Sequence, residues 1–186
     1  MMDDALVGTA YHEAGHAVAA LVLSLPLETV TIEGLSKFWN PIARCEPDTL
    51  GPNERSIIEK AIVMWLAGYY AEQRACPQND AKFGAQGCIE VASDFAELLA
   101  IQPGADEKAK DIFRRSSNRA RRLAAESLEM IADVAELLIA ERTVTCERVV
   151  AVLGADRIAK AREACSSDEQ VATHSATGTI RSHDAA

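Results

Sequence analysis

The segment His12-Glu13-Ala14-Gly15-His16 constrains the fold more than any other part of the sequence. It has the form H-E-x-x-H and lies in an apolar stretch that predicts a helix. Histidines four residues apart project from one face of a helix, so both imidazoles can reach one zinc ion. Glu13 lies close to that face and could accept a proton from a water molecule that zinc activates. The segment therefore predicts a helix that carries a hydrolytic centre.

The alternative is a solvated helix face that happens to carry two histidines and a glutamate. The chain has four histidines, and the other two, His174 and His183, lie in a polar C-terminal segment. The residues on both sides of the motif are apolar, which indicates that the helix is buried. Buried imidazoles and a buried carboxylate need partners, and a metal ion would satisfy them. We therefore favour the zinc site.

Composition limits the class of protein. Of the 186 residues 48% are hydrophobic, enough for one sizeable core, so we predict one domain over residues 1–164 and a disordered polar tail over 165–186. The net charge of −9 argues against nucleic acid or an anionic membrane surface as the main partner. Five cysteines, an odd number without a C-x-x-C pair, favour a reducing cytoplasm. The apolar runs are too short to span a bilayer, and no P-loop motif is present.

The pattern of apolar residues predicts a mainly α fold with a short strand or hairpin beside the motif helix. We expect helices over about 4–24, 52–75, 87–100, 105–141 and 145–152, with further helix over 155–164. Alternating residues predict a strand over 27–33, and 42–46 could form a second one. An arginine cluster falls in the long helix, where we interpret it as a solvated, salt-bridged face; it consists of Arg114, Arg115, Arg119, Arg121 and Arg122.

A catalytic zinc ion typically has three protein ligands, and histidine cannot supply the third in the predicted domain. The candidates are a carboxylate or a thiolate from another helix. Glu90 and Asp94 share one face of the predicted helix 87–100, and Cys88 fits that face less well. Glu72, in the helix before, could be a ligand or could accept a hydrogen bond from a zinc-bound histidine. Spacing alone does not choose among them.

Several segments resemble FtsH-type zinc metalloproteases and occur in the order found in that family. Residues 9–18 around the motif closely resemble the family's zinc-site helix, and Val30-Thr31-Ile32 resembles the strand that follows it. Weaker similarities lie at 67–72, at Ala92-Ser93-Asp94-Phe95, where the family has an Asn-Asp pair, and at 140–144. The resemblance covers about residues 5–153.

This resemblance implies that His12, His16 and Asp94 bind one zinc ion and that Glu13 is the catalytic base. It also implies that the strand near 28–33 presents an edge to an extended peptide. The sequence departs from the family where Ser93 replaces the asparagine and where 87–92 replaces a glycine-rich approach. The family also carries membrane helices and an AAA ATPase module, and we expect neither here.

We therefore predict a cytoplasmic zinc metallopeptidase that hydrolyses unfolded or flexible polypeptides. A separate ATPase chain could deliver the substrate, and the chain could form homo-oligomers. The alternative is a catalytically weak or inactive protease-like module that binds peptides or partner proteins.

Overall fold

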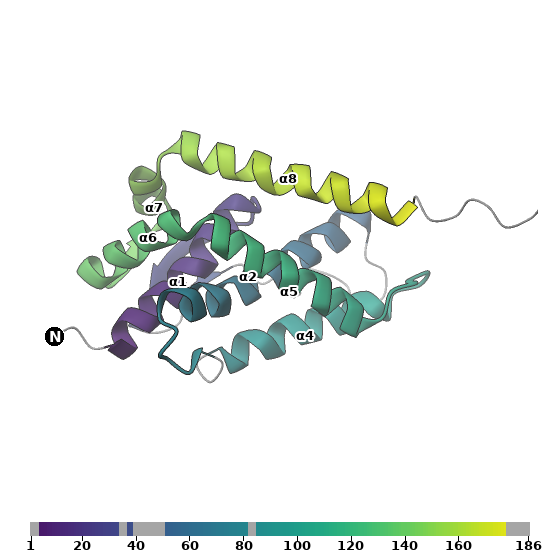
Figure 1. Cartoon of the computed structure of the whole chain (residues 1–186), viewed down its shortest axis with the longest axis horizontal. Coiled ribbons are helices and arrows are strands. Elements are labelled where there is room, and N and C mark those ends of the chain that lie inside the picture. The colour runs from purple at the N-terminus through teal and green to yellow at the C-terminus, as the bar shows by residue number, and fades with distance from the viewer. Residues whose placement is uncertain (1–3, 34–36, 39–50, 82–84, 178–186) are drawn as a thin grey trace, which may run out of the picture.

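The computed structural model describes residues 4–33, 37–38, 51–81 and 85–177. Within these residues it has seven helices and one small antiparallel sheet (Figure 1). The mainly α fold with a strand beside the motif helix, predicted from the sequence, is confirmed. In the described part of the chain, no helix is both long enough and apolar enough to cross a membrane.

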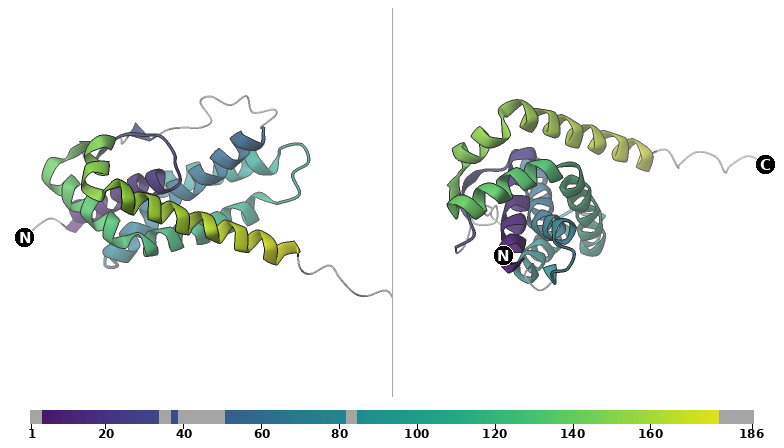
Figure 2. Two further views of the ribbon diagram at one scale, coloured as in Figure 1. Left: turned by 90° about the horizontal axis from the view of Figure 1, so that it is seen from above. Right: turned by 60° about the vertical axis from the view of Figure 1, so that its left-hand side comes forward.

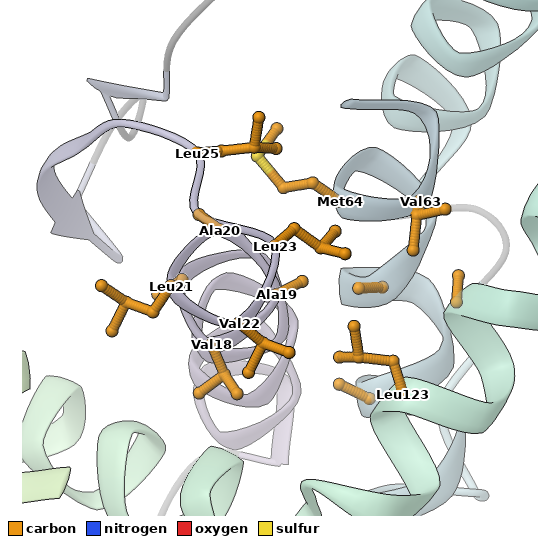
Figure 3. Packing of buried hydrophobic residues seen from close by; sticks show 14 of the residues in the cluster. Val18, Ala19, Ala20, Leu21, Val22, Leu23, Leu25, Val63, Met64 and Leu123 are labelled. Carbon is orange, nitrogen blue, oxygen red and sulfur yellow. The ribbon is translucent and has the colours of Figure 1, made fainter. Parts of the chain in front are cut away.

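Helix α1 (Asp4–Val22) carries the H-E-x-x-H motif and lies in the middle of the fold. It packs against α2 (Pro52–Ala75) and α6 (Leu128–Glu141), and all its residues after Glu13 are buried. Figure 3 shows side chains of α1 in one buried cluster with Val63 and Met64 of α2. An all-round apolar sequence is typical of such a central helix, because every face is covered.

Gly15 allows α1 and α2 to lie this close together. A Cβ atom at Gly15 would lie 2.6 Å from Ala71 Cβ and 2.9 Å from the carbonyl oxygen of Ala67. Both distances are shorter than van der Waals contact, so any larger residue would push α2 away. The glycine within the motif thus has a packing role that compensates for its low helix propensity.

The sheet has the strand order β2-β1-β3, with β1 (Leu27–Thr31) between β2 (Lys37–Phe38) and β3 (Thr143–Thr145). The predicted strand over 27–33 corresponds to β1, whereas 42–46 lies outside the described residues. Both neighbours are antiparallel to β1, and the pairs Leu27↔Phe38 and Val30↔Val144 fix the register. The expectation of an open β1 edge therefore needs correction, because β3 covers one edge and β2 covers the start of the other. The sequence did not indicate β3, which has only three residues.

The predicted helix over 105–141 is in fact two helices, α5 (Ala109–Glu126) and α6. They meet at Ser127, whose backbone leaves the helical region with φ −100° and ψ 13°. Helical hydrogen bonds continue on both sides, from Ser127 N to Leu123 O and from Ile131 N to Ser127 O, both 2.9 Å. The apolar pattern therefore runs through the break without a gap, which explains why one helix was expected.

The remaining helices are α4 (Gln86–Ala100), α7 (Cys146–Leu153) and α8 (Ala155–Thr177). Thr145 caps α7 as predicted, accepting a hydrogen bond from Arg148 N at 3.4 Å. Helix α8 lies along the outside of the other helices (Figures 1 and 2) and continues past residue 164. The division into a domain over 1–164 and a tail over 165–186 stays a prediction.

Two members of the arginine cluster form the ion pairs expected of a solvated face. Arg114 lies 3.0 Å from Asp111 on the same helix. Arg115 lies 2.9 Å from Glu59 of α2 and 3.0 Å from Glu107. The two contacts of Arg115 link α5 to α2 and to the segment before α5. Such exposed ion pairs stabilise a fold only slightly.

Candidate metal centre

The two motif histidines lie side by side at the contact between α1, α2 and α4. Their ring centroids are 4.7 Å apart and the ring planes are at 81° to each other. Both are buried, with 7% exposure for His12 and 1% for His16. Two imidazoles this well buried require hydrogen-bond partners or a metal ion for their ring nitrogens.

Each histidine uses its Nδ1 atom to contact α2. His16 Nδ1 lies 2.8 Å from the carbonyl oxygen of Met64 and donates to it, because a carbonyl can only accept. His12 Nδ1 lies 3.2 Å from Glu72 Oε2. With a proton on each Nδ1, the Nε2 lone pairs are left to bind a metal ion.

Glu72 thus accepts a hydrogen bond from His12, which is the contact expected if it orients the histidine rather than binding a metal ion itself. It is only 8% exposed, and Asn79 Nδ2 contacts its other oxygen, Oε1, at 3.5 Å. The hydrogen bond from His12 lowers the pKa of Glu72, so the carboxylate stays charged. Gly8 leaves room for it, since a Cβ atom there would lie 2.9 Å from Glu72 Oε1 and still closer to Asn79.

Gly68 of α2 makes the corresponding space for His16. A Cβ atom at Gly68 would lie 2.5 Å from His16 Nε2 and 2.6 Å from its Cε1. It would also lie 2.8 Å from the backbone oxygen of His12. The sequence pointed to Gly68 only as part of a weak similarity, and nothing in the local pattern shows that this glycine faces a histidine.

Cys88 of α4 completes the group. Its Sγ atom lies 3.6 Å from His12 Nε2 and 3.5 Å from His16 Nε2. Among the described residues, these three are the one set of His, Cys, Asp or Glu side chains whose ligand atoms all lie within 4.8 Å of one another. Spacing left Cys88 open as a ligand beside three carboxylates, whereas the resemblance implied Asp94.

The two distances from Cys88 Sγ to the imidazole nitrogens fit zinc. Zinc bonds of ~2.0–2.1 Å to nitrogen and ~2.3 Å to sulfur, at a tetrahedral angle, place the two ligand atoms ~3.6 Å apart. The observed N···S distances of 3.5 and 3.6 Å match this value. Soft thiolate and imidazole ligands also favour zinc over magnesium or calcium. The residues present therefore fit a zinc ion with a fourth position for water or substrate.

Electrostatics distinguish the two histidines in the metal-free protein. Burial favours neutral His12, but hydrogen bonds with Cys88 and Glu72 outweigh it and raise its pKa to about 9. Burial lowers the pKa of His16 to about 3, and the charge on His12 acts in the same direction. His16 is thus neutral at physiological pH, whereas a metal ion must displace a proton from His12.

Asp94, the ligand implied by the resemblance, is exposed on α4 and does not belong to this group. Residues six apart on a helix point in directions roughly 120° apart, so Cys88 and Asp94 face different sides. Glu90 is also exposed and accepts a hydrogen bond from Gln86 Nε2 at 3.1 Å. Zinc binding by Asp94 stays a prediction.

The helical period of α4 is a partial sequence signal for Cys88, because it marks the inward face of the helix but not what that face contacts. Its buried residues are Ala92, Phe95, Ala96 and Leu99. Cys88 precedes Ala92 by four residues and Phe95 by seven, so it belongs to the same inward face. Glu13, the predicted base, follows His12 on α1 and is half-buried.

No family model matches the sequence. The chain is 31% identical over 113 residues to the ATP-dependent zinc metalloprotease FtsH of Rickettsia felis, covering 59% of the chain and 18% of that protein. It is 29% identical over 136 residues to FtsH of Rickettsia typhi, covering 72% of the chain and 21% of that protein. It is 32% identical over 124 residues to FtsH of Pirellula staleyi, covering 64% of the chain and 17% of that protein.

The chain is therefore a distant homologue of FtsH zinc metalloproteases, and it spans about a fifth of the length of these curated relatives. The resemblance to FtsH-type zinc metalloproteases is thus confirmed as distant homology.

Proposed function

We propose that the chain is a zinc metallopeptidase in which His12, His16 and Cys88 bind the metal ion. The observation that carries this proposal is the convergence of two imidazole nitrogens and one sulfur at distances that fit tetrahedral zinc. The distant homology to zinc metalloproteases supports the peptidase class.

Each residue has a distinct task in this proposal. Met64 O and Glu72 hold the two imidazoles so that both Nε2 atoms face Cys88. When bound, a zinc ion would polarise the scissile carbonyl and acidify a water molecule. Glu13 would take up a proton from a water molecule at the site and return it to the leaving amine.

The distant homology to FtsH proteases supports a proposal for the substrate class. We propose that the chain cleaves unfolded or flexible polypeptides, which a separate ATPase chain could deliver, because FtsH proteins are named as ATP-dependent. Cysteines 76, 88, 146 and 165 are all free, which is compatible with the proposed reducing cytoplasm.

The test combines zinc content with cleavage of casein, an unstructured substrate. The purified chain should bind one zinc ion per molecule and cleave casein, and a chelator should stop the cleavage. Glu13→Gln should retain zinc and lose cleavage by at least ~100-fold, because it removes only the base. Glu90→Gln, at an exposed carboxylate of α4, is the matched control and should behave as wild type.

The third ligand is tested by substitution on α4. Cys88→Ala should lower zinc affinity, whereas Asp94→Ala should leave it unchanged. The opposite pattern would show that Asp94 is the ligand and would reject Cys88. One bound zinc ion without chelator-sensitive cleavage would favour the alternative of a protease-like binding module.

The same contacts favour a second candidate function, metal-independent thiol hydrolysis. Cys88 Sγ, His12 and Glu72 form a series of nucleophile, base and orienting carboxylate, with contacts of 3.6 and 3.2 Å. In that case cleavage would survive chelation and would be lost after alkylation of Cys88 with iodoacetamide. A metallopeptidase would instead lose cleavage when a chelator is added. Cleavage assays with a chelator and with iodoacetamide therefore separate the two candidate functions.

A further inference from the structure

Cys88 differs from the other two proposed ligands in its chemistry toward oxidants. Imidazole nitrogens are not oxidised by peroxides under mild conditions, whereas a thiolate is. Its Sγ atom contacts both Nε2 atoms, so any change at sulfur affects both histidines. Cys88 is half-buried, whereas His16 is 1% exposed. Cys88 is thus more exposed than either histidine.

We propose that Cys88 is a site of reversible oxidation by peroxides and that this modification controls metal binding. The inference rests on the proposed function, because it takes Cys88 to be a zinc ligand. It adds a regulatory state that neither the relatives nor the motif indicates.

The step balances with hydrogen peroxide as the oxidant. Cys88 Sγ attacks one peroxide oxygen, the O–O bond breaks, and an S–O bond forms. Sulfur loses two electrons and becomes a sulfenic acid, while the leaving oxygen takes a proton and departs as water. A sulfenic acid replaces the thiolate ligand, so His12 and His16 alone are left to hold the ion.

The reverse step requires a reductant from outside the site. The group formed by His12, His16 and Cys88, here called the metal group, contains a single sulfur atom. Among the described residues it therefore holds no second cysteine to form a disulfide. A low-molecular-weight thiol would attack the sulfenic acid and release water, and a second thiol molecule would then free Cys88 as its own disulfide forms. The site would regain its ligand set and rebind zinc.

The experiment uses the full chain loaded with one equivalent of zinc and treated with hydrogen peroxide. Zinc release is followed with a coloured chelator, and sulfenic acid is trapped with dimedone and located by mass spectrometry. We expect roughly one zinc ion released for each Cys88 oxidised, and rebinding after dithiothreitol and zinc are added.

Two variants test whether the effect belongs to Cys88. Cys88→Asp replaces the thiolate by a carboxylate, which zinc also accepts and peroxide does not oxidise. It should keep its zinc under conditions that empty the wild type. A double variant, Cys146→Ser with Cys165→Ser, removes two free thiols that lie outside the metal group and should release zinc like the wild type.

The outcomes separate this inference from the proposed function. Zinc release from Cys88→Asp at the wild-type rate, or retention of zinc by wild type whose Cys88 is fully oxidised, would overturn the inference alone. Peroxide-driven release from a protein that never cleaves casein would support the inference and reject the peptidase. A chain that binds no zinc before treatment would reject both.

Discussion

Replacement of Gly68 by alanine tests the geometry of the site without touching a proposed ligand. The new Cβ atom would lie 2.5 Å from His16 Nε2 and 2.6 Å from Cε1, whereas carbon and nitrogen atoms normally approach to ~3.5 Å. The ring must therefore move by ~1 Å. It cannot simply turn away, because its Nδ1 atom is bonded to Met64 O at 2.8 Å.

A displacement of this size is well beyond the ~0.2 Å within which zinc–ligand distances vary. We expect zinc affinity to fall by at least ~10-fold, as when groups that orient a ligand are lost. Overpacking should also lower the free energy of unfolding of the metal-free chain by ~1–3 kcal/mol. Competition titration with a chromophoric chelator measures the first effect, and urea unfolding measures the second.

Gly87→Ala is the matched control for this prediction. Gly87 lies on α4 next to Cys88, and a Cβ atom there would meet nothing within 4 Å. This variant should bind zinc normally and unfold at the same or a slightly higher urea concentration. If Gly68→Ala behaved as Gly87→Ala does, the contact of His16 with α2 would not be as close as described, and the reasoning would be refuted.

Three further predictions concern the same site. Glu72→Gln keeps the shape of the acceptor but removes its charge, so zinc affinity should fall by about 10-fold in a competition titration. The control variant Gln73→Glu, on the exposed face of α2, should leave zinc affinity unchanged. Because the pKa of His12 is raised to about 9, release of its proton should increase zinc affinity by up to about tenfold per pH unit between pH 7 and 9, and a flat dependence would contradict the contacts of His12. Removal of zinc should lower the unfolding temperature of the wild type, since the ion binds only the folded state. In Cys88→Ala, the unfolding temperatures of the zinc-loaded and the chelated protein should differ by less.

Local patterns predicted the elements well where the relevant residues are neighbours in sequence. The bounds of α2 followed from Pro52 at its start and from its apolar period, and α7 from Thr145 as its cap. The pair His12 and His16 is likewise a matter of helical spacing. Ser127 shows the limit, because a break that keeps the apolar period in phase leaves no mark in the sequence.

The rest of the site depends on contacts between distant segments. Cys88 is 72 residues from His16, and Glu72 is 60 residues from His12. Which face of α4 meets α1 depends on how both helices pack on α2, and that packing is a property of the whole core. For this reason the sequence could list four candidates for the third ligand but could not choose among them.

The close contact between α1 and α2 has a consequence for protein engineering. Grafting the pentapeptide His12–His16 onto a helix of another scaffold would transfer two ligands and a base, but not the parts of α2 that orient them. The recipient would also need a carbonyl at the position of Met64, a carboxylate at that of Glu72 and a glycine at that of Gly68. The smallest transferable unit is therefore a pair of helices with a fixed spacing, and libraries that vary α1 should vary α2 with it.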